Sequence, residues 1–464
     1  MDRRIHLRNA FTVVELLAVV AIIGILVALL LPSVQSAREG ARRISCSKNL
    51  MNVAIAVRSY QAAFGHYPVQ LHGTDGSTVK GEDNDRRLSF LVGLLPFMDQ
   101  VGLAEMIDRQ LPRVNKPDMG MDPEMGMDIQ YGDGSFAAGM LVPNQGVDSL
   151  ELNESSEVNE LAELNEAKVA PSVWPRNGPE PFTGQYRPWM VEIPVLRCPS
   201  DPGYGPVPGS SFVSRTNYAA CLGDSVLASA SGPWKEVKGK FVLDAKLVQQ
   251  TKAAMRGAFV PRVATCDADV TDGISHTILL GEIITSLGDG DRRSRPVVVT
   301  NANDLRDDPN LVWTLNTDRV ASGLEPLYRG YRWAPLPDPQ VAIESTGFSP
   351  TQRRGLRWTD GMPLYTGFNT ILPPNGELVL SAKRDDCWGI LPPSSRHQGG
   401  AHLAMVDGSV RFVTDSIDTG NVNAPTVYVG SASVPGSPSP YGVWGALGTR
   451  ASGELSGMDL LPWE

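Results

Sequence analysis

The longest apolar run in the chain places the strongest constraint on its fold. This run, from Phe11 to Leu31, reads FTVVELLAVVAIIGILVALLL, and its one charged residue is Glu15. As an α-helix it would be about 30 Å long, which matches the hydrocarbon core of a bilayer. Because a carboxyl group is costly inside a membrane, Glu15 predicts a function for this helix beyond anchoring.

Three interpretations of this segment differ in its processing. A secretory signal has an apolar region of only about 7–15 residues. In addition, Gln35 is a poor match to the small residue expected two positions before a cleavage at Ala37. An uncleaved membrane anchor fits the length of the run but leaves Glu15 unexplained. The third interpretation depends on the residues that precede the run.

The leader MDRRIHLRNA (residues 1–10) and the run after it resemble the class III signal of type IV pilins and type II secretion pseudopilins. The resemblance implies that a prepilin peptidase cleaves between Ala10 and Phe11 on the cytoplasmic side and methylates the new amine of Phe11. It also implies that Glu15 sets the register of subunits by pairing with the terminal amine of a neighbour. Ala10 departs from the pattern, because the family usually has glycine there.

A second helical segment follows the membrane segment directly. In residues 33–65, apolar side chains recur mostly three or four positions apart, which predicts an amphipathic helix that ends at Gly65. We therefore expect residues 11–32 to be a transmembrane and assembly helix, which 33–65 continues along the surface of a folded head. Pro32 lies where pilins often have a helix-bending proline.

The composition changes between residues 113 and 180. This stretch contains the imperfect repeat DMGMDPEMGMD, and glutamate then recurs every third residue from Glu151 to Glu166. We expect an inserted, exposed and partly disordered acidic region. It follows a first part of the head, 66–112, in which Leu88–Met98 is a buried strand or a short helix.

Residues 181–420 are expected to form a β-rich head, followed by a tail at 421–464. The predicted fold class is α+β, with the long N-terminal helix packed on a loop-rich head of mostly antiparallel sheet. Short apolar runs between turn residues mark the strands. They are expected in VEIPVLRC, TNYAACLG, GAFVPRVATC and HTILLGEII, and at Val297–Thr300, Leu311–Leu315 and Glu377–Leu380.

The segment HQGGAHLAMVDGSVRFV is expected to be a β-hairpin. Asp407 and Gly408 between two alternating runs are typical of a type I′ turn, in which both turn residues have positive φ. Such a turn would pair Met405 with Val410. The two strands would then share one buried apolar face.

His397 precedes Asp407 with nine residues between them. This His-x9-Asp-Gly pattern, which ends at Gly408, resembles the C-terminal motif of a large prepilin-like family of unknown function that is expanded in planctomycetes. RCPSDP, RTNYAACLG and WGALGTRASGE resemble other parts of that family. With His402 these residues include metal-ligand types, but the turn explains Asp407 and no ligand spacing supports zinc. We expect His397 to hydrogen-bond the hairpin or a neighbouring loop, and we assign no metal.

The other ligand types in the sequence support no specific cofactor. Asp267, Asp269 and Asp272 suggest a calcium loop but do not fit the EF-hand spacing, so calcium stays open without assigned ligands. A net charge of −10 makes nucleic acid an unexpected partner. One or two disulfides are expected in an exported chain, and their pairing is open. The five cysteines are Cys46, Cys198, Cys221, Cys266 and Cys387.

We expect a structural or assembly subunit of a type IV pilus or a type II secretion pseudopilus, and not an enzyme. The expected partners are a prepilin peptidase, other pilin-like subunits or further copies of the chain in a filament, and the inner membrane. The helix would cross that membrane once and leave the head extracytoplasmic, in a surface or periplasmic filament. The alternative is a membrane-anchored extracytoplasmic binding protein, for example for glycans, that uses the pilin-like helix for export only.

Overall fold

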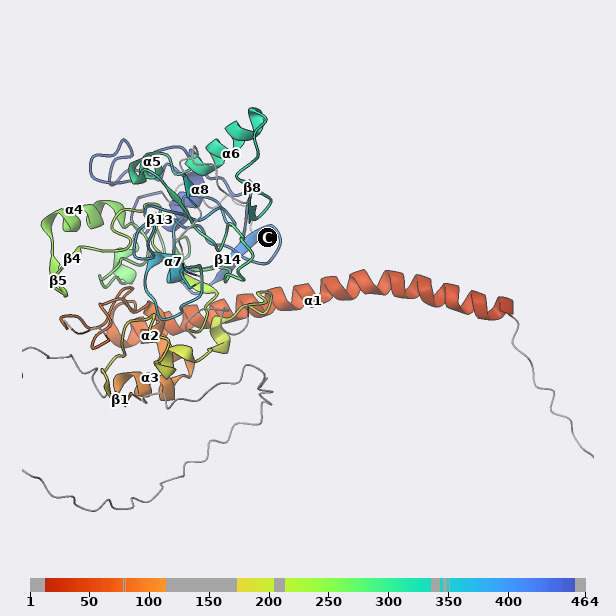
Figure 1. Ribbon diagram of the computed structural model, residues 1–464, viewed down its shortest axis with the longest axis horizontal. Coiled ribbons are helices and arrows are strands. Elements are labelled where there is room, and N and C mark those ends of the chain that lie inside the picture. The colour runs from red at the N-terminus through yellow and green to blue at the C-terminus, as the bar shows by residue number, and fades with distance from the viewer. Residues whose placement is uncertain are drawn as a thin grey trace, which may run out of the picture. The chain divides into compact units, whose positions relative to one another are not determined.

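The computed structural model describes residues 13–77, 79, 81–113, 173–203, 213–334, 343–344, 349 and 351–454. These residues form a long N-terminal helix and a mixed α+β head with several small sheets, which confirms the predicted fold class (Figure 1). The predicted leader and most of the predicted acidic insert lie outside the described residues.

The described helices begin and end as follows. The α-helices are α1 (Val13–Phe64), α2 (Phe90–Leu94), α3 (Val101–Asp108), α4 (Ala245–Ala254), α5 (Ala302–Asp307), α6 (Leu311–Ala321), α7 (Pro363–Thr366) and α8 (Gly442–Gly448). The 3-10 helices are η1 (Leu95–Met98), η2 (Arg187–Met190), η3 (Pro194–Leu196) and η4 (Asp267–Asp269).

The described strands are short. They are β1 (Leu111–Pro112), β2 (Val173–Trp174), β3 (Tyr218–Cys221), β4 (Trp234–Val237), β5 (Lys240–Leu243), β6 (Ile278–Glu282), β7 (Val297–Val299), β8 (Tyr328–Arg329), β9 (Arg332–Trp333), β10 (Ile343–Glu344), β11 (Gly367–Phe368), β12 (Val379–Leu380), β13 (Gly389–Ile390), β14 (Gly400–Met405) and β15 (Val410–Thr414).

Helix α1 is one unbroken helix that contains Pro32 (Figure 1). The described side chains before Glu39 are exposed, whereas one face of the helix from Cys46 onward is buried against the head, with Leu50, Val53 and Val57 at 0% exposure. The helix ends where predicted, because Gly65 adopts a φ of 78° and its amide donates a hydrogen bond to the Gln61 carbonyl at 2.8 Å. Its two halves therefore have different surroundings within one continuous element.

The C-terminal half of α1 covers one face of a five-stranded sheet with the order β11-β3-β6-β14-β15. β11 lies parallel to β3, and the other neighbours are antiparallel. Alternate side chains of β3 point to opposite faces. Tyr218 and Ala220 pack in the core that includes α1, whereas Ala219 and Cys221 pack in a core that includes Trp444 of α8.

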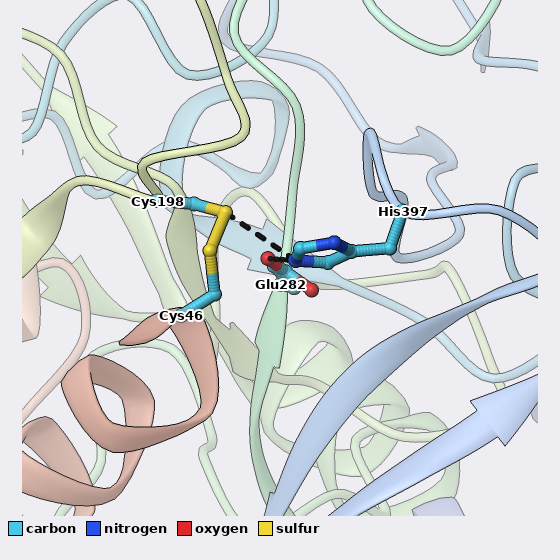
Figure 2. A group of neighbouring side chains, drawn as sticks. All are labelled: Cys46, Cys198, Glu282 and His397. Carbon is cyan, nitrogen blue, oxygen red and sulfur yellow. Dashed lines mark hydrogen bonds and ion pairs between the residues drawn. A yellow bond between two sulfur atoms is a disulfide. The ribbon is translucent and has the colours of Figure 1, made fainter. Parts of the chain in front are cut away.

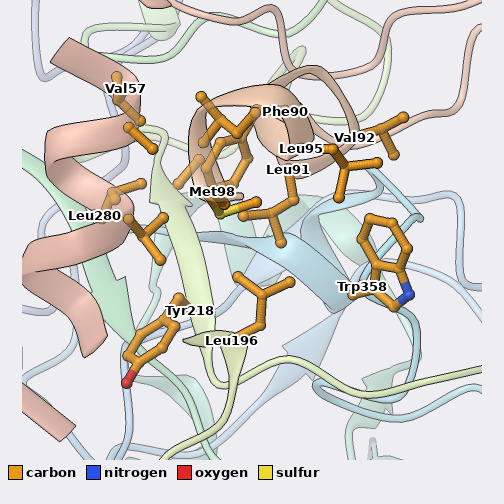
Figure 3. Packing of buried hydrophobic residues seen from close by; sticks show 14 of the residues in the cluster. Val57, Phe90, Leu91, Val92, Leu95, Met98, Leu196, Tyr218, Leu280 and Trp358 are labelled. Atoms are coloured by element: carbon orange, nitrogen blue, oxygen red, sulfur yellow. The ribbon is translucent and has the colours of Figure 1, made fainter. Parts of the chain in front are cut away.

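The core beneath α1 joins segments that are far apart in the chain. Figure 3 shows Val57 of α1, Phe90 of α2 and Leu280 of β6 pointing toward one another, with Leu196 and Trp358 nearby. All five side chains are buried. Because each buried large apolar side chain contributes roughly 1.5–3 kcal/mol, this core holds α1 firmly on the head.

A second sheet has the order β10-β7-β12-β13. β7 is parallel to β12, and the other two pairs are antiparallel. Val297 and Val299 of β7 pack against Leu305 of α5 and Val312 of α6. This sheet belongs to a core separate from the one beneath α1.

The predicted register of the hairpin is wrong by one residue. Ala404, and not Met405, pairs with Val410, and the Met405 amide donates to the Ser409 carbonyl at 2.8 Å. The loop has three residues, and of its Asp407-Gly408 pair only Gly408 has positive φ, at 90°. This is a type I turn followed by a glycine bulge in place of the predicted type I′ turn.

Three predicted strands are absent from their predicted positions in the described chain. The segment Leu311–Leu315 forms the start of α6. Its apolar side chains, Leu311, Val312 and Leu315, recur at helical spacing and pack against one core. VEIPVLRC contains η3, which begins at Pro194. In GAFVPRVATC, Arg262 has a φ of 61° directly after a proline, which breaks an extended strand. The remaining predicted strands are present as β3, β6, β7 and β12.

One compact unit comprises the chain up to Leu111 and again from Trp174 onward. The predicted insert ran to residue 180, but Trp174 belongs to this unit and its ring packs on Tyr186 at 5.7 Å. Gly178 and Glu180 are buried as well. The head therefore resumes at Trp174, because large aromatic side chains bury most of their surface in a core.

Candidate functional site

The candidate site lies where α1 meets the head. Cys46 is the first fully buried residue of α1 among those described, and it forms a disulfide with Cys198, which follows η3 (Figure 2). The two cysteines are 152 positions apart in the sequence. This pairing answers the question that the sequence left open. Cys221, Cys266 and Cys387 are free thiols.

His397 lies beside the disulfide on the loop that leads into β14. Its Nδ1 is 2.9 Å from Oε1 of Glu39 on α1, and its Nε2 is 3.6 Å from the Cys198 sulfur. Nε2 also lies 3.5 Å from Oε1 of Glu282, which is an ion-pair distance longer than a good hydrogen bond. The backbone amide of His397 donates to Ser395 Oγ at 2.9 Å. The imidazole thus touches both the helix and the sheet.

Glu282 is the last residue of β6 and is 1% exposed. Its Oε2 accepts hydrogen bonds from the backbone amide and from Nδ1 of His402, at 3.1 and 3.0 Å. Its Oε1 accepts no hydrogen bond from the described residues and faces His397 and the disulfide (Figure 2). We call the four neighbouring residues the clamp cluster: Cys46, Cys198, Glu282 and His397.

Burial and the neighbouring charged side chains shift the pKa values of Glu282 and His397 in opposite directions. Burial alone raises the pKa of the Glu282 carboxyl, but the side chains of His397 and His402 outweigh it and lower that pKa to about 2. Burial alone lowers the pKa of the His397 imidazole, yet Glu282 and then Glu39 raise it above its usual value. Glu282 is therefore ionised, and its buried charge faces the imidazoles of both His397 and His402.

Further contacts fasten α1 on either side of the clamp cluster. Glu39 accepts from Ser200 Oγ at 3.2 Å and pairs with Arg42 at 2.6 Å. The Arg43 guanidinium lies over the ring of Phe412, 3.6 Å from its centre. Because Phe412 belongs to β15, α1 is joined to the hairpin as well as to β6. Nearer its end, α1 is held by an ion pair between Arg58 and Asp267 at 2.6 Å.

The residues of the His-x9-Asp-Gly motif do not gather at one site. Asp407 Oδ1 accepts from the amide and the hydroxyl of Ser409 at 2.8 and 2.7 Å, so its side chain stabilises the turn. Gly408 supplies the positive φ of the loop. The ring of His397 packs on that of His402 in β14, 5.0 Å away, and its Nε2 contacts Cys198 in the segment after η3. The expectation that it binds the hairpin or a neighbouring loop did not include its further contacts with helix α1 and strand β6, because sequence spacing says nothing about either.

The other predicted site residues have separate positions. Ala10 and Phe11 lie outside the described residues, and so does the side chain of Glu15. The aspartates of the suggested calcium loop have different partners. Asp267 binds Arg58 and Tyr67, Asp269 accepts from the Cys266 amide, and Asp272 accepts from the amides of Ser452 and Gly453.

Glu39 and Glu282 are site residues that sequence reasoning missed. Glu39 lies among other charged residues of a helix, which is the usual appearance of a solvated surface. Glu282 ends the apolar strand ILLGE, and an isolated acid in a buried strand is the one signal that could have identified it. Both carboxylates are recognisable only through their contacts with His397.

The fold and the site define a class: a long apolar N-terminal helix fastened to an α+β head by a disulfide and a buried histidine–glutamate cluster. The chain belongs to the family SBP_bac_10, whose description is "Protein of unknown function (DUF1559)" and whose model matches residues 35–420. Comparisons with curated proteins and with solved structures gave no match. In length and composition, α1 is suited to cross a membrane, as a membrane anchor or a signal sequence.

Proposed function

We propose that this protein is a pilin-like assembly subunit of a type IV pilus or a type II secretion pseudopilus. In this proposal a prepilin peptidase removes residues 1–10 and methylates Phe11. The apolar half of α1 then packs with like helices, and Glu15 sets their register. The chain performs no reaction itself, and its head is carried outside the cytoplasm.

One observation carries the proposal: α1 is a single helix with two different surroundings. Its first half exposes a continuous apolar surface of a length that spans a bilayer, and its second half is built into the head. The clamp cluster joins the second half of α1 to the head through a disulfide and the Glu39–His397 contact, so a force on the helix would act on the head. The disulfide supports an oxidising, extracytoplasmic location for the head.

The first prediction concerns the mature N-terminus. Intact-mass analysis of the membrane-extracted protein is expected to give a chain that begins at Phe11 and carries one additional methyl group. An Ala10→Gly variant restores the usual family residue and should be processed at least as completely, whereas Ala10→Arg should block cleavage. A chain that retains Met1 would contradict the proposal and favour export by an uncleaved anchor.

The second prediction separates assembly from anchoring. Glu15→Val removes the one acid of the apolar run without shortening it, so the variant should remain in the membrane fraction. It is expected to lose at least nine tenths of its incorporation into filaments or secretion complexes, measured by sedimentation of sheared material. Leu16→Val is the matched control and should assemble normally. Normal assembly of Glu15→Val would show that the register role is wrong.

A membrane-anchored binding protein is the second candidate, and a cleft in the head favours it. The cleft has a volume of about 680 Å³ and includes Trp313, Tyr331, Asn375 and Asp415 in its lining. Trp313 is 51% exposed and Tyr331 43% exposed, and exposed aromatic rings beside amide and carboxyl groups suit a sugar ring. Glycan binding by the full chain, lost in Trp313→Ala, would favour this candidate.

A further inference from the structure

The clamp cluster combines the three residue types that commonly bind zinc. Its four ligand atoms, two sulfurs, one imidazole nitrogen and one carboxylate oxygen, all lie within 4.8 Å of one another (Figure 2). They come from α1, the segment after η3, the end of β6 and the loop before β14. All four residues are buried, at 4% exposure or less.

Two of the distances within the cluster match those expected around a tetrahedral ion. Zinc binds sulfur at about 2.3 Å and nitrogen or oxygen at about 2.0–2.2 Å, so neighbouring ligand atoms are about 3.3–3.8 Å apart. His397 Nε2 lies 3.5 Å from Glu282 Oε1 and 3.6 Å from the Cys198 sulfur. Glu282 Oε1 receives no hydrogen bond from the described residues, although it is buried. A buried carboxylate oxygen that accepts no hydrogen bond from its neighbours is suited to bind a cation.

The hydrogen-bond partners of His397 and Glu282 are of the kind that usually surround metal ligands. A histidine that ligates a metal usually donates its other ring N–H to a carboxylate, and His397 Nδ1 lies 2.9 Å from Glu39 Oε1. This contact leaves Nε2 directed at the cluster. A ligating carboxylate is usually hydrogen-bonded through its second oxygen, and Glu282 Oε2 accepts two hydrogen bonds from His402.

We propose that the clamp cluster binds a zinc-class divalent cation when Cys46 and Cys198 are in the dithiol form. A disulfide holds its sulfurs about 2.0 Å apart, whereas two thiolates on one zinc ion are about 3.8 Å apart. The disulfide and the ion therefore exclude each other. Either one joins α1 to the head, so the redox state selects the kind of link. The proposal goes beyond the assembly role and does not depend on it.

The disulfide of the clamp cluster must be reduced before the cation can bind. A phosphine reductant attacks the disulfide, water supplies the oxygen of the phosphine oxide, and the two cysteines become thiols. Binding of one divalent cation then displaces the two thiol protons to solvent, while His397 ligates as the neutral imidazole and Glu282 as the carboxylate. Exchange with a small-molecule disulfide would re-form the Cys46–Cys198 bond, reduce that disulfide to two thiolates and release the cation.

The test uses the full chain in detergent, reduced by a phosphine and titrated with Co²⁺ as a spectroscopic probe. We expect one Co²⁺ per chain, with the visible bands of tetrahedral cobalt and a thiolate-to-cobalt charge-transfer band, both removed by Zn²⁺. The oxidised chain has the same histidine and glutamate and should show neither band. If reduction unfolds the chain, Zn²⁺ should restore its far-ultraviolet circular dichroism. Reduced protein that neither gives the bands nor refolds with Zn²⁺ would overturn the proposal.

Single variants locate the ion. Cys198→Ser should weaken Co²⁺ binding at least a hundredfold and reduce the charge-transfer band. Glu39→Gln leaves all four ligands in place and should weaken binding about tenfold, as expected for a residue that orients a ligand. Cys266→Ser changes a free cysteine outside the cluster and should leave binding within twofold. A site elsewhere would be indicated if Cys198→Ser bound Co²⁺ as tightly as Cys266→Ser did.

Discussion

Replacing Cys46 with serine is expected to lower the free energy of unfolding by about 3–5 kcal/mol. The disulfide closes a loop between residues 152 positions apart, and a cross-link of that length removes much conformational entropy from the unfolded chain. It also joins α1 to the head at the first buried position of the helix. Guanidinium titration of the full chain in detergent, followed by tryptophan fluorescence, measures the loss.

The measurement needs a chelator, so that no cation replaces the disulfide. Cys266→Ser is the matched control, since Cys266 is a half-buried free thiol, and its unfolding should change by less than about 0.5 kcal/mol. Reduction of the wild-type chain should lower its stability as much as Cys46→Ser does. A loss below about 1 kcal/mol in both would mean that packing alone holds the helix.

The second large effect is expected at Asp360, which is fully buried within a network of charges. Arg87 binds both of its carboxylate oxygens at 2.9 Å, and Arg357 donates to one of them at 3.2 Å. Asp360→Ala would leave two buried guanidinium groups with one fewer counter-charge. We therefore expect a loss of about 3–5 kcal/mol in unfolding free energy, measured by the same titration.

Two further variants test whether the missing buried charge causes this loss of unfolding free energy. Asp360→Asn keeps the shape of the side chain and some of its hydrogen bonds but removes its charge, so its loss should also be large. Glu325→Ala breaks an exposed ion pair with Arg329 and should cost less than about 1 kcal/mol. Asp385 lies 3.1 Å from Arg87 and 3.0 Å from Arg357. If Asp360→Ala were as mild as Glu325→Ala, water or Asp385 would be compensating both arginines.

Local signals in the sequence predicted the local parts of the fold. The length of α1 follows from an apolar run and from apolar side chains at helical spacing, and Gly65 ends the helix through its own backbone preference. The strands at TNYAACLG and HTILLGEII follow from short apolar runs between turn residues. In each case the predictive signal lies in residues close together in the chain.

The hairpin shows where such signals fail. Both faces of β14 are buried, so the apolar pattern does not distinguish two registers that differ by one residue. The loop makes the difference, because Asp407 bonds to Ser409 and keeps the turn at three residues. Likewise, Leu311–Leu315 is too short an apolar run to separate a strand from a helix without its neighbours.

The sequence by itself determined a bilayer-length apolar helix that continues into an α+β head, because period and composition act over a few residues. Only the tertiary structure decided that Cys46 pairs with Cys198 and that His397 lies between Glu39 and Glu282. His397 and Glu39 are separated by 358 positions, and nothing in the spacing of either residue specifies the other. Their meeting depends on how β6, β14 and α1 pack together, which is a property of the whole core.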